Sequence, residues 1–254
     1  PLEIRRPTRP GGNIQAWARA ARYDAAAAIA GPRGADLAAG HTAGDQVETI
    51  LYRLASSPSR RALLGMRPRD GALVRPLLAF TRAQTGAYCA ERGLAWREDE
   101  SNNSGAYARG RVRARLVPAL REIHPAAEAN VLALAEVLRD EAEVLDAAVD
   151  ARLGGRDRIA LTSLRELPAA LRRLVVQRLA DGAAGGPAPG AARRADEVAA
   201  LARHGTAMLD LPGGVRAIVE QGVLRFGRTP ALADAEAGRS AEAEPQARAS
   251  APIN

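Results

Sequence analysis

The stretch GHTAGDQVET, residues 40–49, follows a short apolar segment and opens a helix. Residues 36–40 are bounded by turn residues, and we interpret them as a brief buried strand. Thr42 is a suitable N-cap and Asp45, three residues later, completes a capping box, so we expect a helix that runs to about residue 55. The stretch therefore lies at the carboxyl end of a strand, which is where open α/β sheets bind their ligands.

The flanking sequence continues this alternation of helices and strands. We expect a helix over residues 13–30, a strand followed by a loop over residues 73–78, and a strand over residues 94–98. Between the last two, Thr81 and Gln84 form a second capping box that opens another helix. Strands that alternate with helices of ten or more residues are typical of a parallel α/β sheet.

From about residue 106 the pattern becomes mainly helical. A basic helix reaches residue 124, and the next helix carries one apolar stripe at amphipathic spacing. Another helix begins at Pro168, residues 181–190 form a linker or long loop, and a β-hairpin turns at residues 221–222. The expected members of the apolar stripe are Val131, Leu134, Leu138, Ala142, Leu145 and Val149.

These patterns predict an α/β protein in three parts. Residues 1–124 are the C-terminal part of a Rossmann-like, parallel-sheet domain, and residues 125–228 are a mainly helical domain with a terminal β-hairpin. Residues 229–254 are rich in Ala, Glu, Arg and Pro, and we expect this tail to be disordered because it has too little apolar surface to bury.

Composition narrows the classes of function. The net charge is +7 and all 36 basic residues are Arg, whose planar fork suits a polyanionic partner such as nucleic acid. A compositional bias is the main explanation for the replacement of Lys by Arg, and the net positive charge is separate evidence for such a partner. Cys89 is the single cysteine, which excludes an intramolecular disulfide and a cysteine-based metal cluster. No apolar run approaches the roughly 18 residues of a membrane span, so we expect a soluble, cytoplasmic protein.

The helix that opens at Thr42 has the strongest chemical character. At helical spacing His41, Asp45, Glu48 and Tyr52 share one face, and carboxylates in such a crevice suit an ammonium group, a magnesium ion or both. The alternative interpretation is a capped surface helix whose acids only favour the helix dipole.

Six segments, taken in order, resemble the tRNA(Ile)-lysidine synthetase family of the N-type ATP pyrophosphatase group. The resemblance covers about residues 13–228. The segments are ARAARY at 18–23, GHTAGDQVETIL at 40–51, RPLL at 75–78, WREDESN at 96–102, YARGRVR at 107–113 and LPGG at 211–214.

The resemblance implies a ligase that uses ATP, with Mg²⁺, to adenylate C2 of the wobble cytidine of tRNA(Ile) and then joins free L-lysine there. It implies that Asp45 and Glu48 are catalytic, binding the lysine amine or, for Asp45, magnesium. Five further residues are implied to bind substrate. His41 is one of them, and its alternative role is a histidine whose hydrogen bonds are satisfied by the backbone. Asp99 and Asn102 could instead only shape a turn, and Arg109 and Arg113 could instead form a solvated basic face.

Three departures from the family pattern bear on activity. Gly44 stands where the family usually has a first Asp, and Gly110 stands where it often has Asn. The Ser-Gly-Gly-x-Asp-Ser loop, which holds pyrophosphate in the family, does not occur in the sequence. Because the chain begins at Pro1 without methionine, we expect an N-terminal truncation and a polypeptide that is inactive by itself.

Two other functions remain open at this point. One is another tRNA-modifying member of the same group, such as a 2-thiocytidine enzyme, although those depend on paired cysteines. The other is a non-catalytic RNA-binding remnant that kept the helical domain. The sequence leaves the oligomeric state undetermined.

Overall fold

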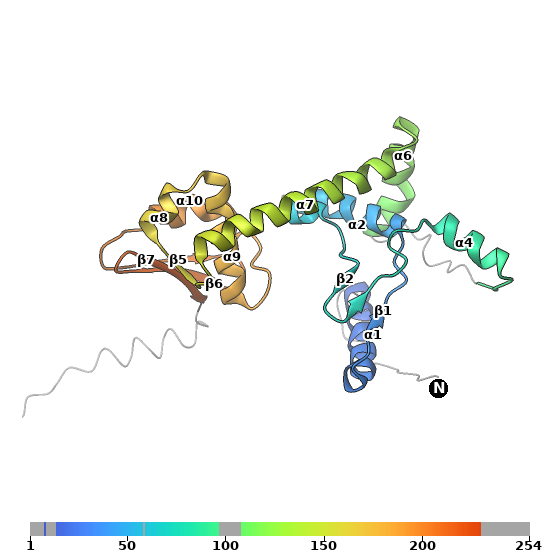
Figure 1. The fold of residues 1–254 in the computed structure, drawn as a ribbon, viewed down its shortest axis with the longest axis horizontal. Coiled ribbons are helices and arrows are strands. Elements are labelled where there is room, and N and C mark those ends of the chain that lie inside the picture. Colours follow the sequence, from blue (N-terminus) through green and yellow to red (C-terminus); the bar gives the residue numbers. More distant parts are fainter. Residues whose placement is uncertain (1–7, 9–13, 58, 97–107, 230–254) are drawn as a thin grey trace, which may run out of the picture. The chain divides into compact units, whose positions relative to one another are not determined.

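The computed structural model describes residue 8 and residues 14–57, 59–96 and 108–229. The chain divides into two compact units, residues 1–141 and 142–254 (Figure 1). Asn13, the first residue of the first expected helix, and residues 230–254 of the expected disordered tail lie outside the described residues. Among the described helices, none combines the length and apolarity needed to cross a membrane.

The first unit combines helices with a small three-stranded sheet in the order β1-β3-β2. β1 and β3 are parallel, with Leu37 opposite Leu73, whereas β2 runs antiparallel to β3. The elements are α1 (Ile14–Ala30), η1 (Gly31–Arg33), β1 (Leu37–Ala38), α2 (Ala43–Ser56), α3 (Arg60–Leu63), β2 (Arg69–Asp70), β3 (Leu73–Val74), α4 (Arg82–Glu91), α5 (Ala108–Arg111), the π-helix η3 (Val112–Leu116) and α6 (Val117–Ile123).

The α/β class is as predicted, but the sheet differs from the expectation in two places. The sheet is mixed rather than parallel, and β1 is not buried, because Leu37 is only half-buried and Ala38 is exposed. Residues 94–96 form no strand, and Leu94 and Trp96 are each more than half exposed. Their apolar character therefore does not reflect a place in the core; residues 97–98 lie outside the described part.

A small apolar core holds the first unit's helices together. Val47 and Leu51 of α2 are buried against Val112 and Val117, which lie in the continuous helical segment formed by η3 and α6. The start of α7 (Ala127–Leu153) joins this core through Val131. The sequence placed the domain boundary after residue 124, between α6 and α7. The first compact unit extends further, to residue 141 within α7.

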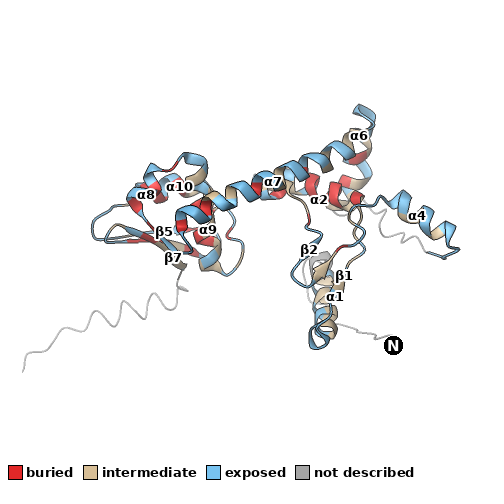
Figure 2. Ribbon diagram, viewed as in Figure 1, coloured by how far each residue is buried: buried red, intermediate tan, exposed pale blue. Residues whose placement is uncertain are grey.

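The second unit has a larger core between helices and a four-stranded antiparallel sheet in the order β4-β7-β6-β5. Buried residues are frequent on α8, α9 and α10 (Figure 2). Its elements, after the end of α7, are β4 (Arg158–Ala160), α8 (Leu161–Glu166), α9 (Ala169–Ala184), η4 (Ala191–Arg194), α10 (Ala195–Ala200), β5 (Thr206–Leu211), β6 (Val215–Glu220) and β7 (Val223–Arg228).

The predicted hairpin and the helix start at Pro168 are confirmed. β6 and β7 pair throughout, and the turn between them places Gln221 and Gly222 at φ 49° and 76°, the conformation that two-residue hairpin turns require. The hairpin is extended on both sides by β4 and β5, which the sequence patterns did not predict. Pro168 is the N-cap of α9.

Two expectations for this helical part are corrected. Leu134 of the predicted stripe is 55% exposed, and its neighbour Ala135 is buried instead. Of the expected linker or long loop at residues 181–190, only residues 185–190 form a loop, since α9 continues to Ala184, and this loop is packed on the core through the fully buried Ala188. The Asp181 carboxylate accepts a hydrogen bond from the Ala188 N–H at 2.8 Å, which fixes the loop to α9.

Candidate functional site

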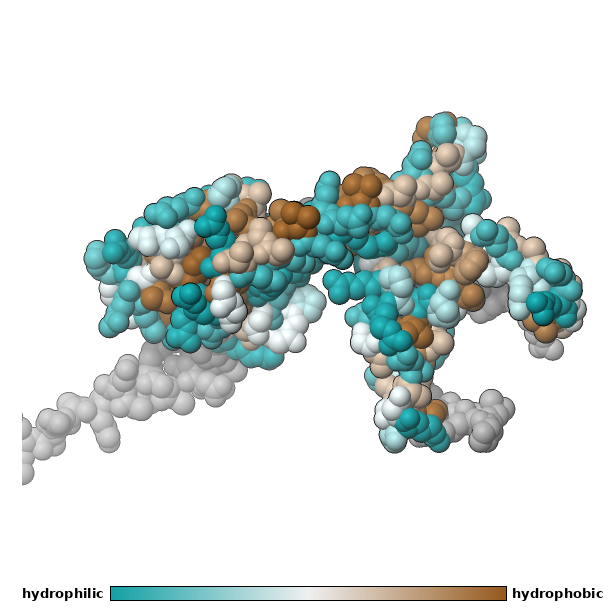
Figure 3. Space-filling model, in the orientation of Figure 1, coloured by the Kyte–Doolittle hydropathy of each residue, from teal (hydrophilic) through white to brown (hydrophobic). Residues whose placement is uncertain are grey.

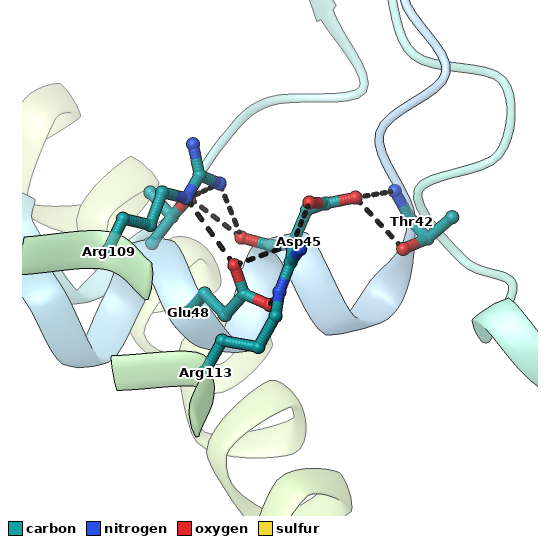
Figure 4. A network of polar contacts seen from close by, with 6 residues as sticks. Thr42, Asp45, Glu48, Arg109 and Arg113 are labelled. Carbon is teal, nitrogen blue, oxygen red and sulfur yellow. Dashed lines mark hydrogen bonds and ion pairs between the residues drawn. The ribbon is translucent and has the colours of Figure 1, made fainter. Parts of the chain in front are cut away.

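The amino end of α2 is built as the sequence predicts. Thr42 is the N-cap, and the Asp45 carboxylate accepts hydrogen bonds from the Thr42 N–H at 2.9 Å and from its hydroxyl at 3.0 Å (Figure 4). The Ala43 N–H donates to the Phe80 carbonyl at 2.9 Å, which ties the start of α2 to the loop before α4. One carboxylate oxygen of Asp45 is therefore occupied by the helix cap.

Two arginines reach this helix from a distant part of the chain. Arg113, in η3, donates to both oxygens of Glu48, at 2.5 Å from Nε and 3.0 Å from Nη2, and its Nη2 lies 3.4 Å from Asp45 Oδ1. Arg109, in α5, donates from Nη2 to the Asp45 carbonyl at 3.0 Å and to the Thr49 hydroxyl at 2.7 Å. Figure 4 shows both guanidinium groups turned toward the acidic side of α2.

Glu48 is the centre of this network. Its side chain is only 7% exposed, and besides Arg113 it has Arg109 Nε at 3.6 Å. The hydrogen bond to Glu48 raises the pKa of Arg113, with the attraction of Glu48 and Asp45 adding to the effect and burial opposing it. Two carboxylates and two guanidinium groups thus largely compensate one another, and Asp45 Oδ1 is the least firmly held of the carboxylate oxygens.

His41 does not share the helix face that its spacing predicted. α2 begins at Ala43, so His41 precedes the helix by two residues. Its Nδ1 is buried without a hydrogen-bond partner in the described residues. Burial lowers the pKa of His41, and Arg19, Arg75 and Arg109 lower it further while Asp45 opposes the shift, so the imidazole is neutral at pH 7.

Residues 64–67 form a loop that no sequence motif marked as important. Four consecutive carbonyl groups of this loop each accept a hydrogen bond from a different side chain of the first unit. The pairs are Arg139 with Leu64 at 3.0 Å, Arg53 with Gly65 at 2.8 Å, Gln46 with Met66 at 2.9 Å, and Arg75 with Arg67 at 2.6 Å.

Gln46 holds this loop through both atoms of its amide. Its Oε1 accepts from the Met66 N–H at 2.7 Å, while its Nε2 donates to the Met66 carbonyl. The two polar side chains of α2 therefore have different partners: Gln46 contacts the 64–67 loop, and Glu48 contacts Arg109 and Arg113. Gln46 lies inside the quoted motif, but its burial and its contact with Met66 were not predicted from the sequence.

Replacing Gly65 with Ala is expected to destabilise the first unit by about 2 kcal/mol. Gly65 has φ +65°, and an added Cβ would lie 2.7–2.8 Å from the Gln46 amide. Gly71 is the matched control, because it has φ +59° but no atom within 4 Å of an added Cβ. Thermal unfolding of both variants measures the difference, and an equal loss for the two would show that the Gln46 contact does not constrain position 65.

Asp99 and Asn102 lie outside the described residues. A Cβ added at Gly44 would have only the Thr42 hydroxyl nearby, at 3.9 Å, so a Cβ at this position meets no steric obstacle. Tyr52 is 42% exposed. In the described part, no group of three or more His, Cys, Asp or Glu side chains has a geometry that would hold a metal ion.

Comparison with known proteins identifies relatives of this chain. Residues 2–120 match the model of the PP-loop domain, and this match indicates ATP binding. The tRNA(Ile)-lysidine synthase of Mycolicibacterium paratuberculosis is 40% identical over 182 residues, which is 68% of this chain and 55% of that protein. The same enzyme from Symbiobacterium thermophilum is 37% identical over 86% of this chain and 50% of its own length.

A third relative is covered more completely. The tRNA(Ile)-lysidine synthase of Salinispora tropica is 38% identical over 228 residues, which is 85% of this chain and 68% of that protein. The chain spans about half the length of the first two relatives.

Proposed function

The chain belongs to the tRNA(Ile)-lysidine synthase family, and we propose that it is the part of such an enzyme that carries the acidic end of α2 and the two arginines facing it. The proposed reaction is the ATP-dependent ligation of free L-lysine to C2 of the wobble cytidine of tRNA(Ile), with release of AMP and pyrophosphate. The enzyme is proposed to work in the cytoplasm.

The observation that carries this proposal is the pairing of Asp45 and Glu48 with Arg109 and Arg113. These four residues belong to two segments of the family motif that are far apart in the sequence, and they meet at the amino end of a helix that follows a strand. A mixed group of acids and arginines at such a place can bind an ammonium group and phosphate groups side by side.

Each of the four residues has a proposed role. Asp45 would attract the ε-ammonium group of lysine through Oδ1, the oxygen that the helix cap leaves available. Glu48 would orient Arg113 and Arg109, because it is buried between them. The two arginines would face phosphate groups of ATP or of the RNA backbone, and His41, as a neutral imidazole, would contact the nucleotide without adding charge.

These residues can hold a magnesium ion only when phosphate oxygens of the substrate supply further ligands. Mg²⁺ is commonly held by one or two carboxylates together with phosphate oxygens and water. Asp45 offers one such oxygen, and Glu48 is occupied by Arg113. Mg²⁺ would supply charge neutralisation for the phosphates of ATP, and Asp45 is the residue that would hold it.

Recognition of the tRNA is proposed for the part after residue 124. Residues 125–228 contain the antiparallel sheet and the helices α8 to α10. The net charge of +7 supports an RNA partner for the chain as a whole. Asp99 and Asn102 are proposed as substrate-binding residues on the strength of the family motif alone.

The test is the incorporation of labelled lysine into unmodified tRNA(Ile) by the protein as its gene encodes it, with ATP and Mg²⁺ present. Labelled tRNA together with lysine-dependent release of AMP is the expected result. Tight tRNA binding without AMP release would overturn the proposal in favour of a non-catalytic RNA-binding protein.

A further inference from the structure

The carboxyl ends of two parallel strands bring Arg75 and His41 to one edge of the small sheet. β1 and β3 pair in register, and the Ala39 N–H donates to the Val74 carbonyl at 2.9 Å just beyond β1. Arg75 is the first residue after β3, and His41 follows β1 by three residues. In α/β sheets this edge is where ligands bind.

Arg75 is buried with a positive charge that no described carboxylate neutralises. The residue is 6% exposed, and Nη1 donates to the Arg67 carbonyl. Its Nε is buried and has no hydrogen-bond partner among the residues that the structure describes. A buried guanidinium group without a counter-ion is energetically costly, so the arrangement is more stable with an anion beside it.

The surroundings of Arg75 add to the excess of positive charge. Burial lowers the pKa of Arg53, and the repulsion of Arg109, Arg19 and Arg75 lowers it further. The carboxylates of Asp45 and Glu48 pair with Arg113 and Arg109 instead, and no ion pair with Arg75 is found among the described residues. Arg53 and Arg75 are also anchored to adjacent parts of the 64–67 loop, which restricts their movement.

We propose that Arg75 and His41 form a subsite for a phosphate group at the carboxyl ends of β1 and β3. Arg75 supplies the counter-charge, and the buried Nδ1 of His41 supplies a second polar atom that has no partner in the described protein. This inference rests on the proposed function for the source of the phosphate, which is either the nucleotide or the RNA backbone. Neither source is needed for the subsite itself to bind an inorganic anion.

The first test is a titration of this 254-residue chain with inorganic pyrophosphate, followed by NMR at the imidazole of His41. The sequence contains three histidines, so His41→Gln assigns the signal. A bound anion stabilises the imidazolium form, so pyrophosphate is expected to raise the pKa of His41 from its lowered value in the free protein. An unchanged His41 signal at saturating pyrophosphate would overturn the proposal without the use of any Arg75 variant.

The second test compares Arg75→Gln with Arg67→Gln by calorimetry. Arg67 lies in the 64–67 loop, whose last carbonyl Arg75 contacts, but Arg67 itself is exposed, so its replacement removes one positive charge without removing a buried guanidinium group. We expect pyrophosphate to bind at least tenfold more weakly to Arg75→Gln and less than twofold more weakly to Arg67→Gln, with Arg75→Lys in between. Equal affinities for the Gln variants would contradict the inference, and thermal unfolding confirms that each variant is folded.

Competition identifies the source of the phosphate. A non-hydrolysable ATP analogue that displaces pyrophosphate points to the nucleotide, and an oligoribonucleotide without a terminal phosphate that displaces it points to the RNA backbone. The result is separable from the lysine-incorporation test. Anion binding without lysidine formation would overturn the proposed function alone, whereas lysidine formation with no effect of Arg75→Gln on anion binding would overturn this inference alone.

Discussion

Replacing Glu48 with Ala is expected to lower the free energy of unfolding of the first unit by about 2 kcal/mol. The change leaves Arg113 and Arg109 without the carboxylate that both contact, and the Glu48 side chain is 7% exposed. The effect is smaller than for a fully buried pair, because each arginine side chain remains about one third exposed to solvent, at 34% and 35%. The midpoint of thermal unfolding should fall by roughly 4–8 °C.

Glu136→Ala is the matched control for this prediction. Glu136 also pairs with an arginine, Arg139, at 3.3 Å, but its side chain is 76% exposed, so its removal should change stability by less than about 0.5 kcal/mol. A double-mutant cycle of Glu48→Ala with Arg113→Ala should show coupling in the free energy of unfolding, since Arg113 destabilises the protein only when Glu48 is absent. Similar midpoints for Glu48→Ala and Glu136→Ala would show that the network does not hold α2 to η3.

Replacing Asp45 with Asn in the complete enzyme is expected to reduce lysidine formation by at least about 100-fold. Asn keeps an oxygen that can accept the Thr42 N–H, so the helix cap survives and stability should change by less than about 1 kcal/mol. What is lost is the negative charge that the proposed function assigns to lysine or magnesium binding. Affinity for tRNA(Ile) should remain within about twofold, because RNA binding relies on positive rather than negative side chains.

Asp36→Asn provides the comparison for the activity measurement. Asp36 lies in the same unit and also pairs with an arginine, Arg69, at 2.5 Å, but both side chains are about half exposed. Its replacement should leave lysine incorporation unchanged. Turnover of Asp45→Asn at the level of the unmodified enzyme would remove Asp45 from the proposed site, while leaving the membership of the family intact.

Two large aromatic side chains around α4 are about half exposed. Tyr88 of α4 is 54% exposed and Phe80, just before the helix, is 49% exposed. Hydrophobic surface is visible beside α4 in Figure 3. The capping pattern at Thr81 and Gln84 thus located the start of α4 correctly but did not determine what its apolar side contacts.

Local features were predictable because they depend on neighbours in the chain. The capping boxes at Thr42 and Thr81 lie where their residue spacing indicated, since a cap is decided within one helical turn. The hairpin at residues 221–222 followed from the same kind of signal, as its turn needs residues that tolerate positive φ. The expected strand at residues 94–98 was wrong over its described part, because apolar composition alone does not supply a pairing partner.

The sequence by itself determined which residue types are available, where most helices begin, and which family the motifs belong to. Only the tertiary structure decided that Glu48 contacts Arg113, 65 residues away, and that Arg75 is buried without a counter-ion among the described residues. Helical and strand periodicities report which side of an element is buried, but they carry no information on which distant element covers it. The charges of the candidate site therefore acquire partners, or remain without them, only when the helices and the sheet pack together.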